Sequence, residues 1–163
     1  MFYIGVIGAA RCSPAELELA ESVGRQIARA GAVLVCGGRG GVMEAAARGA
    51  RIEGGVSIGI LPGTQRAEAN PELTYALPTG LGNARNAVIA CACDALIAIT
   101  GGYGTLSEIG LALKMNKPVV GLRTWRISPP AGSVLPPLVH ADNAEQAVRL
   151  ALQAIARGGQ ARK

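Results

Sequence analysis

Histidine is the scarcest reactive side chain in this 163-residue sequence, with His140 as its single copy. A zinc site built from several histidines is therefore excluded, and any Ser-His or Cys-His catalytic pair would have to use His140. The cysteines, at positions 12, 36, 91 and 93, form no CxxC pair, and their spacing matches neither a zinc site nor a small disulfide framework. We expect buried, reduced thiols and no metal site.

Aromatic residues make up only 3% of the chain, which disfavours the stacking platforms that bind single-stranded nucleic acid. No uninterrupted apolar run approaches the roughly 18 residues of a membrane span, and the apolar start is too short for a signal peptide. The net charge of +5 is modest and comes partly from the basic C-terminus. We therefore expect a cytoplasmic protein with neither a nucleic acid nor a membrane as its partner.

Glycine, in contrast, is abundant, with 23 copies and no collagen-like period. Half of the residues are apolar and 17% are charged, so the composition is that of a globular chain rather than a disordered one. A chain of this length favours a single domain. We expect that domain to span residues 1–157 and a basic tail to follow at 158–163.

Short apolar runs alternate with longer segments of helical periodicity. Ser13, Pro14 and Glu16 predict a capping box at the first helix. Continuously apolar strands joined by helices indicate a parallel sheet with helices on both faces, so the expected fold is a single Rossmann-like α/β domain. The predicted strands are 2–9, 32–36, 56–61, 73–77, 95–99, 118–122 and 134–139, and the predicted helices are 14–30, 42–53, 83–93, 105–116 and 143–156.

Three glycine-bearing turns, at 8–11, 37–41 and 101–104, each lead from a predicted strand into a predicted helix. Ligands of open parallel sheets bind beyond the carboxyl ends of the strands, and a helix N-terminus there offers free N–H groups to an anion. Tight turning is the other reason for such glycines, but their repetition at one sheet edge favours a phosphate site. The predicted phosphate-binding residues are Gly8, Gly37, Gly38, Gly40, Gly41, Gly101, Gly102, Gly104 and Thr105.

Neither double-glycine turn matches the dinucleotide fingerprint, because each lacks its final glycine, and no acidic residue closes the second strand. A GxxxxGK[ST] loop is also absent. Glu108 has two interpretations that residue type alone does not separate: a capping box with Thr105, or a carboxylate that faces the ligand crevice. Arg85 likewise fits either a surface ion pair or a ligand contact.

Two of these segments resemble motifs of the LONELY GUY (LOG) family. Residues 37–50 look like its GGG-x-x-GLM-x-x-x-x-x-GA segment, residues 100–108 look like its PGG-x-GT-x-x-E motif, and Arg85 stands at the family spacing. The resemblance implies a Rossmann-like homodimer without a metal that cleaves the N-glycosidic bond of nucleoside 5′-monophosphates. By the same resemblance Arg85 and Glu108 are catalytic, and glycines 101, 102 and 104 with Thr105 hold the 5′-phosphate.

The chain departs from the LOG pattern at three positions, where Asn86, Thr100 and Ser107 replace a lysine, a proline and a glutamate. Residues 85–86, 104–114, 117–120 and 139–142 are more similar to a branch that includes molybdenum cofactor carrier proteins. That branch implies binding of a phosphate-bearing pterin without hydrolysis. The sequence thus predicts a small phosphorylated ligand. It leaves open whether the chain is a hydrolase that needs no cofactor, or instead a molybdenum cofactor carrier or a nucleotide sensor that does not cleave its ligand. Tyr75 and Tyr103 are its candidate tyrosine contacts.

Overall fold

The computed structural model describes residues 1–132 and 138–160, and in these residues seven parallel strands form one sheet. The strand order is β4-β3-β2-β1-β5-β6-β7. The strands are β1 Tyr3–Gly8, β2 Val33–Cys36, β3 Ser57–Leu61, β4 Tyr75–Pro78, β5 Ala95–Ile99, β6 Val119–Leu122 and β7 Val139–His140. The helices are α1 Pro14–Arg29, α2 Val42–Ile52, α3 Arg85–Ala92, α4 Tyr103–Lys114 and α5 Ala144–Gln160, with 3-10 turns η1 Arg66–Glu68 and η2 Gly82–Ala84.

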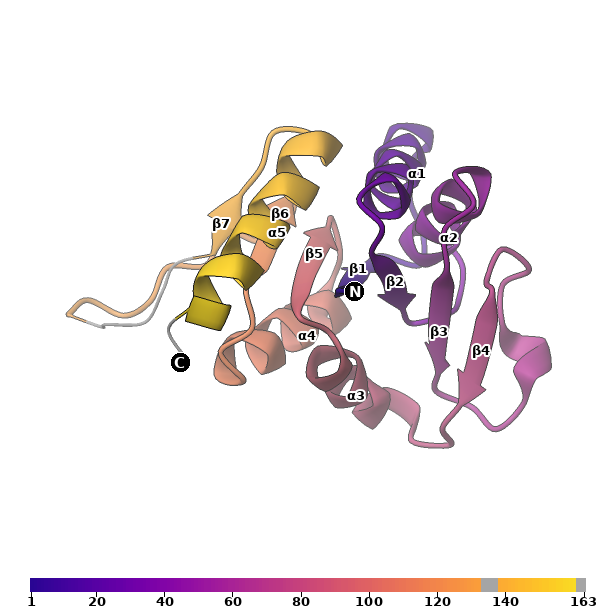
Figure 1. Cartoon of the computed structure of the whole chain (residues 1–163). Coiled ribbons are helices and arrows are strands. Elements are labelled where there is room, and N and C mark those ends of the chain that lie inside the picture. Colours follow the sequence, from indigo (N-terminus) through magenta and orange to yellow (C-terminus); the bar gives the residue numbers. More distant parts are fainter. Residues whose placement is uncertain (133–137, 161–163) are drawn as a thin grey trace.

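The helices lie in two layers on either side of the sheet: α1, α2 and α5 cover one face, and α3 and α4 cover the other (Figure 1). Along β1, Ile4 and Val6 pack toward the three-helix layer, while Ile7 packs toward α3 and α4. Because both faces are buried, the strands carry continuous apolar runs. The expected single Rossmann-like α/β domain is confirmed.

Helices α1 and α2 approach each other through small residues. A Cβ added at Gly24 would lie 1.9 Å from the Ala46 carbonyl oxygen, and one added at Gly49 would lie 2.0 Å from that of Glu21. The predicted capping box of α1 is confirmed, since the Ser13 N–H donates to Glu16 Oε2 over 2.7 Å and Ser13 Oγ accepts from the Glu16 N–H. The first feature packs α1 closely on α2, and the second fixes the start of α1.

The order in which successive strands join the sheet reverses between β1 and β5. Strand β1 pairs with β2 on one side and with β5 on the other, so successive connections lead away from this point in opposite directions. Such a switch point opens a crevice beyond the carboxyl ends of the two strands. Gly8 lies opposite Ile99 in the register, and a Cβ at Gly8 would be 2.4 Å from the Ile99 carbonyl oxygen.

Several boundaries differ from the prediction. Helix α4 begins at Tyr103, two residues earlier than expected, and α5 extends to Gln160. Of the edge strand predicted at 134–139, residues 134–137 lie outside the described part, which contains β7 at Val139–His140. Cys91 is exposed, contrary to the expectation of buried thiols, because it points outward from α3, whereas Cys36 and Cys93 are buried. No helix within 1–132 and 138–160 is long and apolar enough to span a membrane.

Candidate functional site

A cavity of about 270 Å³ lies at the switch point, beyond the carboxyl ends of β1, β2 and β5. Two larger cavities near β6 and β7 have mainly apolar walls, and a third, of about 390 Å³, lies between the start of α1 and α2. The residues of the switch-point cavity come from the loops and helix starts that follow the strands: Ile7, Gly8, Ala9, Ala10, Gly37, Arg39, Met43, Asn83, Arg85, Asn86, Gly102, Gly104, Thr105 and Glu108. The topology therefore brings seven of the eleven predicted site residues to one cavity wall.

Arg85 and Glu108 face each other inside this cavity. Arg85 is the first residue of α3 and Glu108 follows one turn into α4, so the two adjacent helices hold the pair in place. Arg85 Nη1 lies 3.7 Å from Glu108 Oε1, and the two side chains are 13% and 9% exposed. Arg85 Nε and Nη1 are buried and have no hydrogen-bond partner among the described residues. Buried N–H donors are normally paired, so these two are suited to an incoming acceptor.

Burial also changes the protonation of this pair. It raises the pKa of Glu108 to about 7, with the positive charge of Arg85 opposing the rise. Burial lowers the pKa of Arg85, and the Glu108 carboxylate opposes that change. Glu108 can therefore exchange a proton near neutral pH, whereas an ordinary glutamate would be fully ionised.

The turn at 101–104 presents an open helix N-terminus. Gly102 is the residue that precedes α4, no side chain caps the helix, and the first intrahelical bond is from the Leu106 N–H to the Gly102 carbonyl. No heavy atom lies within 4 Å of a Cβ built on Gly102 or Gly104. An oxyanion can therefore approach the free N–H groups of the first turn closely.

The capping interpretation of Glu108 is wrong. Since α4 starts at Tyr103, Thr105 is already inside the helix and cannot cap it. The Thr105 side chain packs against Gly101, whose φ is +102°. Glu108 is left free of backbone donors and lines the cavity.

The turn at 37–41 is filled by protein atoms instead. The Val42 N–H, at the start of α2, donates to the Ala9 carbonyl over 3.0 Å. A Cβ at Gly41 would lie 2.4 Å from the same oxygen, and one at Gly37 would lie 2.3 Å from Arg85 Nη1. Gly37 thus makes room for the guanidinium and lines the cavity, whereas Gly38, Gly40, Gly41 and Gly101 are not among its lining residues.

The segment after β6 makes hydrogen bonds to the turn at 101–104 and to the residue before it. Trp125 Nε1 donates to the Gly102 carbonyl over 3.2 Å, and Thr124 Oγ1 donates to the Thr100 carbonyl. The Trp125 ring also packs against Tyr103, with 5.8 Å between the ring centroids. Tyr103 faces this segment, and neither it nor Tyr75 is among the residues that line the cavity.

Two cavity residues, Arg39 and Asn83, are not among those that the sequence predicts. Arg39 stands inside a run of glycines at the predicted sheet edge, and this position in the sequence is the one signal that it lies near the site. Two of the departures from the LOG pattern also touch each other, because Asn86 Nδ2 donates to Ser107 Oγ over 3.3 Å. Ser107 Oγ in turn donates to the Gly104 carbonyl over 2.7 Å, so both departures bear on the open turn.

The fold and the site define a Rossmann-like protein whose switch-point cavity combines an open helix N-terminus with an arginine–glutamate pair. No cluster of three or more histidine, cysteine, aspartate or glutamate side chains that could hold a metal ion occurs in the part of the chain described. Comparison with known families gives the family directly. The chain belongs to the SLOG cluster4 family, which matches residues 1–154.

Its relatives include proteins of two functional kinds. The molybdenum cofactor binding protein of Rippkaea orientalis is 36% identical with a TM-score of 0.84, over 94% of this chain and 96% of that one. The molybdenum cofactor carrier protein of Chlamydomonas reinhardtii is 36% identical with a TM-score of 0.82, over 96% and 99% of the two chains. A cytokinin riboside 5′-monophosphate phosphoribohydrolase of Mycobacterium tuberculosis is 33% identical over 90% of this chain and 91% of its own. The comparisons thus support a nucleotide-related or a molybdenum cofactor carrier role.

Proposed function

We propose that the chain binds a phosphorylated ligand in the switch-point cavity and carries it without cleaving it, as a molybdenum cofactor carrier in the cytoplasm. The observation that carries this proposal is the pair of buried, unpartnered nitrogen atoms of Arg85 in the cavity that the N-terminus of α4 also lines. A phosphate would satisfy both groups at once, because each offers N–H donors and positive charge. The similarity to a molybdenum cofactor binding protein and a molybdenum cofactor carrier protein, each 36% identical, supports carriage.

Each cavity residue has a defined part in this binding. The first-turn N–H groups of α4 and the Thr105 hydroxyl hold the phosphate, and Gly102 and Gly104 leave the space that it needs. Arg85 neutralises the bound anion from the α3 side. Glu108, protonated below about pH 7, reduces the repulsion that a carboxylate would exert on that anion.

The carrier proposal is tested on the purified full chain. Wild type, Arg85→Gln and Gly110→Ala are compared for molybdenum cofactor retained on purification and for binding of added cofactor. Gly110 lies on α4 but does not line the cavity, so its variant is the matched control. We expect wild type and Gly110→Ala to bind the cofactor and Arg85→Gln to lose most of it. Absence of binding by the wild type would overturn the proposal.

A second candidate function, N-glycosidic hydrolysis of nucleoside 5′-monophosphates, is favoured by Glu108 beside Arg85. An ionised Glu108 carboxylate, which predominates above about pH 7, could stabilise an oxocarbenium-like ribosyl centre or position the attacking water. Arg85 would orient the sugar or the phosphate. These are the two positions to which the LOG resemblance assigns catalysis.

A panel of nucleoside 5′-monophosphates separates the two functions. Release of a free base and ribose 5-phosphate by the wild type, abolished in Glu108→Gln, would establish the hydrolase and contradict carriage without cleavage. Glu108→Gln preserves the shape of the side chain, so its loss of turnover with retained phosphate binding would be a catalytic effect. A wild type that binds nucleotides without any turnover would exclude the hydrolase.

We propose in addition that the chain forms the homodimer that the LOG resemblance implies, and that the outward faces of α3 and its neighbour α4 make the interface. Both helices carry partly buried apolar side chains, among them Val88 and Leu111, which pack only partly on the core. Light scattering coupled to gel filtration tests this: a dimer is expected for the wild type, and a monomer for Val88→Glu. A monomeric wild type would contradict it.

A further inference from the structure

Arg39 is a second arginine of the cavity, and the functions above give it no part. It lies in the turn between β2 and α2 and reaches the cavity from the side opposite to α4. Its side chain is 53% exposed, and Nη2 lies 3.1 Å from Glu68 Oε2. Half-exposed ion pairs of this kind contribute at most about 1 kcal/mol, so an anionic ligand can replace Glu68 at little cost.

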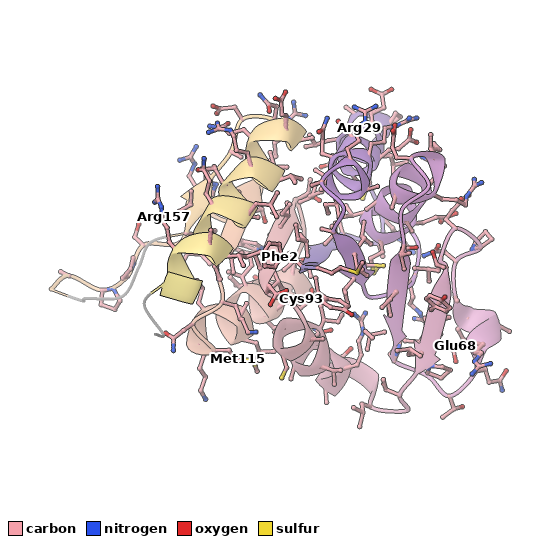
Figure 2. All side chains as sticks on the ribbon, viewed as in Figure 1. Phe2, Arg29, Glu68, Cys93, Met115 and Arg157 are labelled. Atoms are coloured by element: carbon pink, nitrogen blue, oxygen red, sulfur yellow. The ribbon has the colours of Figure 1, made fainter. Side chains whose placement is uncertain are left out.

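The surroundings of Arg39 fix its backbone and hold its side chain through the half-exposed pair with Glu68. The Arg39 carbonyl accepts a hydrogen bond of 2.9 Å from Nδ2 of the buried Asn70, whose own N–H donates to the Gly38 carbonyl. Glu68 ends η1 near the outer strand β4 (Figure 2), and a Cβ at Gly63 would lie 2.0 Å from its Oε1. Gly63 therefore leaves space for the carboxylate that holds Arg39 at the rim.

The charges of the cavity do not balance. Arg39, Arg85 and the N-terminus of α4 are positive, and Glu108 is the single carboxylate among the lining residues. Arg39 is close enough to Arg85 to lower its pKa by repulsion, in addition to the larger effect of burial. A phosphate at α4 would neutralise only one side of the cavity, because α4 follows β5 and Arg39 follows β2, with β1 between them. Two strand spacings separate these sides by about 10 Å.

We infer that the ligand carries a second anionic group about 10 Å from its phosphate, and that Arg39 leaves Glu68 to bind this group, while Arg85 stays with the phosphate. The inference rests on the proposed phosphate binding at α4. It selects a ligand class: a phosphorylated molecule whose far end bears a metal oxyanion or a second phosphate. A nucleoside monophosphate with a neutral base would leave the Arg39 side unneutralised.

Tungstate is a suitable probe, since it is a fully ionised oxyanion near pH 8 and is located by its anomalous scattering. Crystals of the full chain soaked in tungstate are expected to contain one ion between the α4 N-terminus and Arg85 and another at Arg39. In Arg39→Gln only the α4 ion should remain. Arg66→Gln is the matched control, because Arg66 lies in the same segment as Glu68 but does not line the cavity.

Equilibrium dialysis gives the corresponding affinities in solution. Arg39→Gln should weaken the second binding event about tenfold and change the first less than about twofold, whereas Glu68→Gln, which frees Arg39, should strengthen the second about threefold. Molybdate and phosphate, dialysed in parallel, distinguish the two sources: the anion that binds more tightly at the Arg39 side identifies the far group. Circular dichroism verifies that each variant is folded.

Each outcome decides between the two claims. An ion at α4 with no Arg39-dependent second ion overturns the second anionic group and leaves the proposed function standing. A second ion that persists in Arg39→Gln also overturns it. The absence of any ion at α4 contradicts the proposed phosphate site itself. Two ions in the wild type, one of them lost in Arg39→Gln and kept in Arg66→Gln, support the inference.

Discussion

The two double-glycine turns at the carboxyl edge of the sheet are similar in sequence and opposite in surroundings. In the turn at 37–41, protein atoms occupy the space beside the glycines: the Arg85 guanidinium beside Gly37 and the Ala9–Ala10 backbone beside Gly41. In the turn at 101–104, Gly102 and Gly104 face open space. Glycine thus serves close packing in one turn and ligand access in the other. A glycine-rich turn at a sheet edge is therefore no proof of a phosphate site.

Gly41→Ala should have the largest effect of the changes that test this contrast. Gly41 has a φ of +67°, and an added Cβ would collide with the Ala9 carbonyl and the Ala10 backbone. We expect the free energy of unfolding to fall by about 3 kcal/mol or more, measured by urea denaturation. Gly40→Ala is the control, since its nearest heavy atom is 3.6 Å away, and it should cost less than about 1 kcal/mol. Equal stability of the two variants would contradict the close packing of the turn at 37–41.

Glu108 connects the two turns through Arg85, and its raised pKa predicts a pH-dependent stability. Between the ordinary glutamate value of 4.5 and about 7, the unfolded chain loses this proton while the folded chain keeps it. The wild type should therefore lose about 3 kcal/mol of stability as the pH rises through this window, and a Glu108→Gln variant should lack this loss. Urea denaturation of both proteins from pH 4.5 to 8 measures the difference. Parallel curves would show that Glu108 titrates normally.

Gly37→Ala should affect binding more than folding. Its Cβ would meet the flexible tip of Arg85, which can move, rather than the backbone. Displacement of the guanidinium should weaken sulfate binding about tenfold, and sulfate is a useful probe because its charge is constant over this pH range. In an Arg85→Gln background the same change should have no further effect, which calorimetric titration of the double variant can test. Additive losses would mean that Gly37 acts independently of Arg85.

Gly102→Ala and Gly104→Ala should have the smallest effects on folding. No heavy atom obstructs either Cβ, and we expect stability changes within about 1 kcal/mol in thermal unfolding. Sulfate affinity should nevertheless fall about threefold, because the methyl group occupies the approach to the helix N-terminus. Gly110→Ala, also unobstructed and on the same helix, should leave binding unchanged. A marked destabilisation by Gly102→Ala would mean that the second turn is packed as well.

The fold could be predicted because its signals are local. The buried strands are continuous apolar runs. The helices carry apolar residues at helical spacing or a capping residue such as Ser13. The local pattern places the start of α4 two residues late, because Thr105 and Glu108 are ideally spaced for a capping box. Gly102 precedes the helix instead, and the Thr124 and Trp125 hydrogen bonds fix the turn. A distant segment of this kind leaves no signal in the local pattern.

The site could be predicted in part. Arg85 and Glu108 are identified through the family resemblance, and the structure brings them to 3.7 Å. The contact between Asn86 and Ser107 was not foreseeable, because 21 positions separate them and only the packing of α3 on α4 joins them. The glycine run around Arg39 marks its turn, but its importance depends on Arg85 across the cavity, and no spacing rule connects two residues on different loops.

Trp125 is the single tryptophan of the chain, and its indole N–H is bonded to the carbonyl of Gly102 at the open turn. Its emission therefore comes entirely from one position beside the candidate site. We expect an anion that binds at the first turn of α4 to alter the electric field at the indole and, with it, the fluorescence spectrum. The molecule thus contains its own optical reporter, and a broad set of unlabelled anions can be screened against it by fluorescence alone.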